Sequence, residues 1–384
     1  MRYRKLKADE LFDGNQLWKD KVLILNPYNI VESIVPTSEA GEDIETYPGI
    51  LTPGFINAHC HLELSYLKGL VSTGLGLVDF LLSVIKLRSG LQANKHEPIV
   101  NAIEEMRSKG IVAVGDICNT VDAVAAKQNS GMDWYSFIEI INYRKERLGD
   151  VIANSRDIVD QHTSSGLSAV LSAHAPYTVN ADTYKIINEA TGGKTITIHN
   201  QESEAEDALF KTGHSDFLRI YQKFGDGTSP FPVSGKSSFQ TWLPFFNNAQ
   251  TILSVHNTYT SKEDIDFGKE YASKHEVQIV YCLCPNANLY IENKLPPIEL
   301  LMEYDCDIVL GTDSYSSNHQ LDIAAEMKAI AKGYPHLPIE LLLKWATSNG
   351  AKALGLQGYG SFQKGYQPGV VLFDPQTFTS KKLI

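Results

Sequence analysis

The 384-residue sequence has no excess of positive charge and no long apolar run. Its formal net charge is −11, which argues against a surface that binds nucleic acid or anionic membranes. No 18 consecutive residues are apolar, so no membrane span is expected. The basic N-terminal segment also lacks the apolar core that a secretory signal peptide needs. Partners such as nucleic acid and membrane are therefore not expected.

Cysteine is scarce as well. There are five cysteines, an odd number in a chain without an export signal, which predicts free thiols in a reducing cytoplasm. The sequence contains no P-loop and no HExxH motif. Cys282 and Cys284 in YCLCPN precede the proline and lie two residues apart, so they do not match the Pro-Cys-x-x-Cys zinc signature. We interpret them as strand residues.

Short runs of apolar or β-branched residues recur along the chain, with helix-like stretches between them. There are eight such runs, at 54–61, 110–117, 134–140, 167–175, 194–202, 251–257, 277–286 and 306–314. This alternation predicts an α/β protein with a closed (β/α)8 barrel, the TIM barrel. Most runs end in a polar residue, and in this fold functional groups lie at the carboxyl ends of the strands. A doubly wound open sheet is the alternative, but it concentrates function at one switch point.

The two ends of the chain follow a different pattern. Residues 1–50 and 351–384 contain strand-like segments that add no strand-helix unit to the barrel of residues 51–350. We expect these ends to form one small β-sandwich subdomain. Residues 205–250 are rich in Gly, Ser, Pro and aromatic residues, which is typical of a lid or pocket wall. A surface elaboration is the alternative for that segment.

The segment HCH at 59–61 ends the first predicted barrel strand. Because residues i and i+2 of a strand point the same way, His59 and His61 can reach one metal ion, whereas Cys60 points outward. For this pair alone, the alternative is that both histidines are ordinary core or surface residues that bind no metal. Residues of metal-binding type also end three other strands: His199, His256 and Asp313. Since the strand ends of a barrel converge, these residues together predict a metal site.

Six motifs occur in the order PGFINAHCHLELS, HAPYTV, IHNQES, VHNT, CPNANLYI and GTDS. Together they resemble the amidohydrolase superfamily, in the branch of cytosine deaminase, guanine deaminase and the methylthioadenosine/S-adenosylhomocysteine deaminases. The resemblance implies a metal-dependent aminohydrolase that replaces an exocyclic amino group of a purine-like or other nitrogen heterocycle by oxygen and releases ammonia. The alternative is hydrolysis of another C–N or C–Cl bond, in a cyclic amide or a chlorotriazine-like compound, at the same site.

The resemblance also implies roles for individual residues. One divalent metal per chain, with Zn²⁺ expected ahead of Fe²⁺, would be held by four ligands: His59, His61, His199 and Asp313. The predicted fourth strand has no lysine that would bridge a second metal. Three residues are implied to be catalytic, through proton transfer or orientation of the attacking oxygen: Glu202, His256 and Asp313. His174 is implied to face the substrate.

Other substrate contacts are less clearly marked. Glu63 follows the histidine pair and is expected to face the pocket. Arg144 follows the third strand and is expected to pair with an anionic group such as a carboxylate, which would suit a benzoate-bearing purine nucleoside like aminofutalosine. A solvated helix start is the alternative for Arg144. The expected assembly is a cytoplasmic homo-oligomer, a dimer, that acts on a small heterocyclic molecule.

Overall fold

Eight parallel strands form the centre of the computed structural model, which describes residues 3–91 and 94–384. These strands are β8 (Phe55–Cys60), β9 (Ile111–Cys118), β10 (Asp133–Ile140), β11 (Ser168–Ala173), β12 (Thr195–Asn200), β13 (Thr251–His256), β14 (Gln278–Leu283) and β15 (Asp307–Leu310). They are hydrogen-bonded in two parallel sheets of four, in the orders β11-β10-β9-β8 and β12-β13-β14-β15. Each strand coincides with one of the eight predicted runs.

The two sheets meet at two seams, where side-chain hydrogen bonds add to a few backbone ones. Between β11 and β12, the Ser172 hydroxyl donates to the Thr197 carbonyl at 2.7 Å and accepts from the Thr197 N–H at 2.8 Å. Between β8 and β15, the Asn57 amide donates to the Thr312 hydroxyl and accepts from the Thr312 N–H. The predicted (β/α)8 barrel fold is therefore confirmed, with the strand ladder interrupted at both seams.

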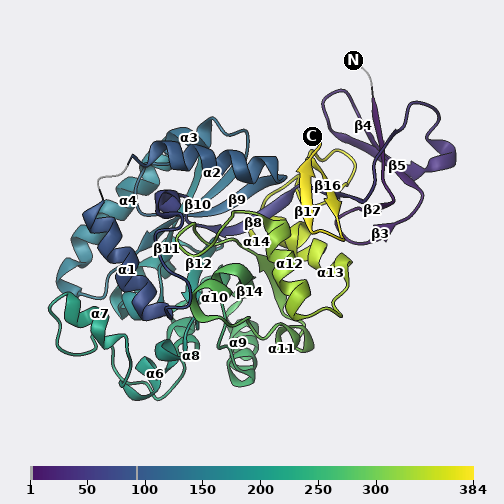
Figure 1. Ribbon diagram of the computed structural model, residues 1–384. Coiled ribbons are helices and arrows are strands. Elements are labelled where there is room, and N and C mark those ends of the chain that lie inside the picture. The colour runs from purple at the N-terminus through teal and green to yellow at the C-terminus, as the bar shows by residue number, and fades with distance from the viewer. Residues whose placement is uncertain (1–2, 92–93) are drawn as a thin grey trace.

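Helices surround the strands (Figure 1). They are α1 (Leu77–Gly90), α2 (His96–Ser108), α3 (Val124–Gln128), α4 (Leu148–Ser164), α5 (Ala181–Ala190), α9 (Lys262–His275), α10 (Pro285–Glu292), α11 (Ile298–Glu303), α12 (Ile323–Gly333), α13 (Ile339–Ala346) and α14 (Ser348–Ala353). Local sequence sets their ends; at α9, for example, Ser261 and Asp264 form a reciprocal capping box. Over the described residues, no helix has both the length and the apolar character needed to cross a bilayer.

Both chain ends contribute to a β subdomain beside the barrel, where purple N-terminal and yellow C-terminal strands lie together in Figure 1. One sheet has the order β5-β4-β1-β6, from β1 (Arg4–Lys7), β4 (Lys21–Leu25), β5 (Val31–Pro36) and β6 (Glu45–Thr46). The other has the order β17-β16-β7-β2-β3, from β2 (Glu10–Phe12), β3 (Leu17–Trp18), β7 (Ile50–Pro53), β16 (Val370–Asp374) and β17 (Thr379–Lys382). Leu6, Leu23, Leu51 and Val370 belong to one apolar cluster that joins the two sheets. This arrangement confirms that both chain ends build a small β subdomain, while its predicted bounds stay a prediction.

The long segment between β12 and β13 contains α6 (Glu204–Thr212), α7 (Leu218–Lys223) and α8 (Ser238–Trp242). Phe217 and Tyr221 of this segment are buried in an apolar cluster that also includes Leu77, Phe80 and Val84 of α1. The segment and α1 thus pack together through their apolar side chains. This packing positions α7 beside the cavity described next.

Candidate active site

Side chains from three strand ends, those of β8, β12 and β15, meet at the mouth of the barrel. The Nε2 atom of His61 lies 3.1 Å from Nε2 of His59 and 3.1 Å from Nε2 of His199. The Oδ1 atom of Asp313 lies 3.3 Å from Nε2 of His61 and 3.7 Å from Nε2 of His59. The structure therefore brings together the four residues that were expected to bind a metal.

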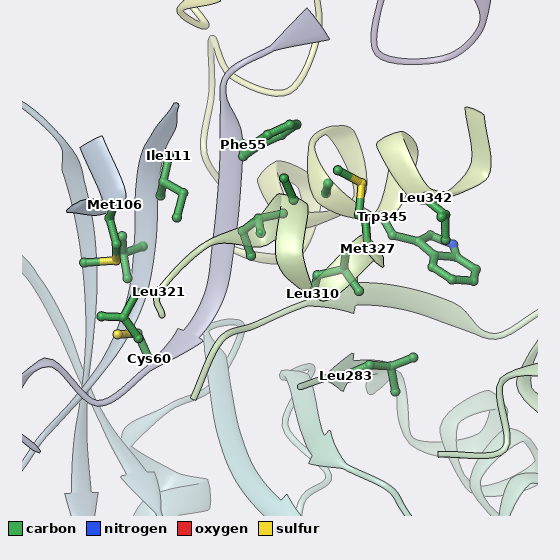
Figure 2. Close-up of a cluster of buried hydrophobic side chains, with 14 of the residues drawn as sticks. Phe55, Cys60, Met106, Ile111, Leu283, Leu310, Leu321, Met327, Leu342 and Trp345 are labelled. Carbon is green, nitrogen blue, oxygen red and sulfur yellow. The ribbon is translucent and has the colours of Figure 1, made fainter. Parts of the chain in front are cut away.

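Cys60 lies on the opposite side of β8 from this cluster. Its side chain is fully buried in the apolar cluster that contains Met106 and Leu321, as Figure 2 shows. This orientation is the one that strand alternation predicts.

Hydrogen bonds fix the orientation of two imidazoles. The Nδ1 atom of His199 donates to the His174 carbonyl at 2.7 Å, so its unprotonated Nε2 faces His61. The Nδ1 atom of His256 donates to Oδ1 of Asn288 at 3.0 Å, and the Asn288 amide nitrogen donates in turn to the Thr258 hydroxyl. Both rings therefore direct an Nε2 lone pair toward the site when they are neutral.

The four side chains fit a divalent transition metal. Burial is the main cause that lowers the pKa of His59, His61 and His199, which favours the unprotonated nitrogens that a metal ligand needs. Burial alone would raise the pKa of Asp313, but its interactions with the neighbouring imidazoles outweigh burial and hold the pKa well below its usual range. Close imidazole nitrogens around one carboxylate are a ligand set that suits zinc or iron. The Nδ1 atom of His59 is buried without a partner.

Two further predicted residues lie beside this cluster. His256 offers a donor atom within 4.8 Å of donors of His59, His199 and Asp313. Its Nε2 atom lies 3.6 Å from Oε1 of Glu202, which is also buried. Burial, and next the charge of Asp313, raise the pKa of Glu202 well above its usual range. A protonated Glu202 can donate a proton to a bound molecule.

The site opens into a cavity of about 210 Å³. Its polar inner end is lined by His61, His174, His199, Glu202, His256 and Asp313. The rest of the wall is mostly apolar and comes largely from α1 and α7, including Phe80, Leu81, Val84, Ile220 and Tyr221. The α1 wall was not predicted, although residues 77, 80, 81, 84, 85 and 88 recur at helical spacing along one face.

Two expected substrate contacts are satisfied by other protein groups. The Glu63 carboxylate accepts hydrogen bonds from the Asn119 N–H at 3.1 Å and from the N–H and hydroxyl of Thr120, both at 2.9 Å. Arg144 pairs with Asp226 at 2.7 Å and donates to the carbonyl of residue 224 at 2.6 Å. Neither Glu63 nor Arg144 lines the cavity. Each side chain is instead engaged in holding a loop, and substrate contact by either residue stays a prediction.

Two other charged residues line the cavity and were not predicted as site residues. Arg88, at the end of the α1 face, is exposed. Glu139 in β10 is buried, and its Oε2 accepts a hydrogen bond from Nδ2 of Asn119 at 3.0 Å. The Oε1 atom of Glu139 has no hydrogen-bond partner; it lies 3.8 Å from Nδ1 of His199 and 4.0 Å from Nε2 of His174. Its position at the end of a predicted strand was the available signal.

Asp116, the corresponding acidic residue of β9, does not line the cavity. Its Oδ2 lies 2.6 Å from Nζ of Lys127 in α3, and its Oδ1 accepts from the Leu62 N–H at 2.8 Å. Lys127 also contacts Sγ of Cys118 and Oγ of Ser136, both at 3.1 Å. Its strand-end position therefore did not identify a site residue. The Asp116 carboxylate instead holds the backbone N–H of Leu62, the residue that follows His61.

The backbone at the strand ends is unusual. His256, Asn257 and Asp313 have φ values of +71°, +56° and +55°, in the left-handed region that non-glycine residues seldom adopt. The Asp313 N–H donates to the His59 carbonyl at 3.1 Å, which holds this turn against β8. The turns bring His256 and Asp313 toward the cavity.

The profile of the amidohydrolase family matches residues 50–383 of this chain. An adenosine deaminase of Helicobacter pylori is 28% identical over 359 residues, which span 88% of this chain and 85% of that protein. A 5-methylthioadenosine/S-adenosylhomocysteine deaminase of Pyrococcus abyssi is 25% identical over an alignment of 391 positions, which covers 97% of this chain and 82% of that protein.

The fold is also found in a solved structure. The crystal structure of Helicobacter pylori aminofutalosine deaminase in complex with methylthio-coformycin superposes with a TM-score of 0.80. The match covers 97% of this chain and 92% of that chain, at 23% sequence identity. At this identity the likeness concerns the fold, and it spans the barrel and the terminal β subdomain together.

Proposed function

The chain belongs to the amidohydrolase family and is a metal-dependent hydrolase of carbon–nitrogen bonds, and on this premise we propose that it deaminates adenine nucleosides. The observation that carries the proposal is the pairing of Glu202 and His256, 3.6 Å apart, beside the metal-ligand cluster at the inner end of the cavity. A proton donor for a ring nitrogen and an acceptor for an attacking oxygen are what replacement of an exocyclic amino group requires. The names of the two sequence relatives support the adenine nucleoside as substrate.

The cavity wall supports a nucleoside rather than a nucleotide. Among the described residues that line the cavity, Arg88 is the one arginine or lysine, and it is at the outer end of the α1 face. A phosphate would ordinarily need several cationic or N–H donors around it. The apolar side chains of α1 and α7 instead suit an apolar group at the 5′ position of the sugar.

We propose that His59, His61, His199 and Asp313 hold one divalent metal, with zinc expected ahead of iron. When it is bound there, such a metal lowers the pKa of a coordinated water to about 7 and provides a nucleophile at neutral pH. Two observations support this role: the donor atoms are mutually close, and the tautomer of His199 is set by a backbone carbonyl.

The protein residues divide the proton transfers between them. Glu202 gives a proton to ring nitrogen N1, which makes the adjacent carbon C6 electrophilic. Neutral His256 accepts a hydrogen bond at Nε2, because its Nδ1 donates to Asn288, and so it orients the attacking oxygen. Asp313 accepts the proton that the attacking water loses and passes it to the amino nitrogen, which then leaves as ammonia. The hydroxyl that remains on C6 returns a proton to Glu202, and the ring keeps the oxygen as a carbonyl.

An assay of ammonia release tests this function. The chain is expressed with added zinc, its metal content is measured, and it is offered adenosine, 5′-deoxyadenosine, 5′-methylthioadenosine, guanine, cytosine and a chlorotriazine. We expect one metal per chain and ammonia release from the adenine nucleosides, fastest with an apolar 5′ group. Release of ammonia from guanine or cytosine alone, or of chloride from the triazine alone, would contradict the proposal.

We also propose where the enzyme is located and how it assembles. All five cysteines are free thiols in the structure, which supports a reducing cytoplasmic location. The expected homodimer stays a prediction. Sedimentation equilibrium of the metal-loaded protein measures its mass in solution directly.

A further inference from the structure

Glu139 lies in the active-site cavity with one carboxylate oxygen fixed and the other free. We propose that this free oxygen binds the vicinal hydroxyl groups of the substrate ribose, so that Glu139 selects ribonucleosides. The inference deepens the proposed function and rests on it. It assigns a sugar subsite to β10, separate from the residues that carry out the chemistry.

The first argument is the unpaired oxygen. Glu139 is 9% exposed, and its Oε1 atom has no hydrogen-bond partner, whereas its Oε2 is held by Asn119. Asn119 is itself held, because its N–H donates to the buried Glu63 carboxylate. A buried acceptor without a partner is unfavourable, and a ligand that donates hydrogen bonds removes this penalty. The geometry therefore presents a rigid acceptor to whatever fills the cavity.

The second argument is the order of the residues around the barrel. Glu202 follows β12, His174 follows β11 and Glu139 lies in β10, so three successive strands supply them. In an adenine nucleoside, N1, N3 and the ribose 2′-hydroxyl follow one another along one edge of the molecule. A substrate with N1 at Glu202 places N3 toward His174 and the sugar hydroxyls toward Glu139. The protein order matches the ligand order.

The third argument is that few groups other than the sugar hydroxyls are available to pair with the free oxygen of Glu139. Glu139, His174 and His199 have donor atoms within 4.8 Å of one another, which raises the possibility of a second metal. However, Nδ1 of His199 donates to the His174 carbonyl, and Nδ1 of His174 is paired with the Thr178 hydroxyl at 2.8 Å. That leaves one histidine nitrogen and one carboxylate, fewer ligands than a tight site needs. In an adenine nucleoside the base has no donor beyond the reacting amino group, so the sugar hydroxyls remain.

The test compares Glu139→Gln with wild type on matched substrates. A glutamine keeps the size of the side chain, but Asn119 retains the oxygen and the amide nitrogen then faces the cavity. Glu146→Gln is the matched control, because Glu146 is exposed in the loop after β10 and does not line the cavity. The substrates are 5′-methylthioadenosine and its 2′,3′-dideoxy analogue. Binding of inosine and 2′,3′-dideoxyinosine by calorimetry gives a readout that does not depend on turnover.

We expect wild type and Glu146→Gln to prefer the ribonucleoside by roughly 10- to 100-fold in kcat/KM, the range for one hydrogen bond to a charged group. Glu139→Gln should lower this preference to within about threefold, mainly through KM, and should keep one metal per chain. An unchanged preference, or loss of the metal, would overturn the sugar subsite alone. If metal-loaded wild type deaminates no adenine nucleoside, both this inference and the proposed function fail.

Discussion

Two buried carboxylates on neighbouring strands, Glu139 in β10 and Asp116 in β9, differ in how completely their oxygens are paired. In the cavity, Oε1 of Glu139 has no protein partner. The rear cluster consists of Asp116, Lys127, Cys118 and Ser136, and both Asp116 oxygens have partners there. The free oxygen of Glu139 is therefore available to a ligand, whereas Asp116 belongs to the scaffold.

The opposite charges of Asp116 and Lys127 compensate each other within the rear cluster. Burial alone would lower the pKa of Lys127, but the Asp116 carboxylate outweighs burial and raises it, so the lysine stays charged. Because Asp116 also accepts from the N–H of Leu62, the charge pair is connected to the backbone directly after His61. The rear cluster thus supports the position of a metal ligand without contacting the cavity.

The largest expected effect is on the cavity side, from His61→Ala. His61 is in contact with three of its proposed fellow ligands, so its loss removes a central donor and leaves the charge of Asp313 poorly compensated. We expect a loss of metal affinity of more than about 100-fold, and turnover at background level. Elemental analysis after dialysis measures the first effect. A variant that retains one metal per chain would break the assignment of this cluster.

The next effect is expected from Glu202→Gln, which changes proton transfer but not metal binding. Turnover should fall by roughly 10²- to 10⁴-fold, because general acid–base catalysis contributes about this much. Metal content should stay at one per chain. Steady-state kinetics and elemental analysis on the same preparation separate the two readouts. If kcat stays above about a tenth of wild type, another group moves this proton.

A third test changes the rear cluster. Lys127→Met leaves Asp116 as a buried charge without its partner, which should lower the free energy of unfolding by about 3–5 kcal/mol. Urea denaturation of the metal-free protein measures this. The double variant Lys127→Met with Asp116→Asn removes both charges and should recover part of the loss. A cost below about 1 kcal/mol for the single variant would remove the distinction between the clusters.

The smallest effect is expected from Cys60→Ala. Cys60 adjoins His59 and His61 in sequence but packs in the apolar cluster of Figure 2, so the loss concerns packing and should be about 1–2 kcal/mol at most. Metal content and kcat should match wild type. Release of the metal by this variant as readily as by His61→Ala would show that Cys60 is a ligand, contrary to the alternation of β8.

The sequence was sufficient for the strands and for the convergence of His59, His61, His199 and Asp313, because alternation within a strand and convergence of strand ends are local and topological rules. It was not sufficient to separate Asp116 from Glu139. Both are acidic residues near the ends of neighbouring apolar strands. Which one faces the cavity depends on the register of β9 and β10 and on the arrival of Lys127 from α3.

The positions of Glu63 and Arg144 away from the cavity have a similar cause. Each lies close to a site residue in sequence, and each carries a charge that suits a substrate. Each is satisfied by a loop distant in the chain: residues 119–120 for Glu63 and residues 224–226 for Arg144. Tertiary partners of this kind have no signature in a single sequence.

The left-handed turns at His256 and Asp313 have a consequence for how such an enzyme changes over time. A non-glycine residue in this backbone region costs roughly 1–3 kcal/mol relative to a relaxed conformation. Glycine would relieve that cost at either position and would also delete the side chain that the site requires. Selection for stability and selection for catalytic activity therefore favour different residues at these two positions. In homologous chains that no longer need catalytic activity, substitution by glycine at these two positions would carry no functional cost.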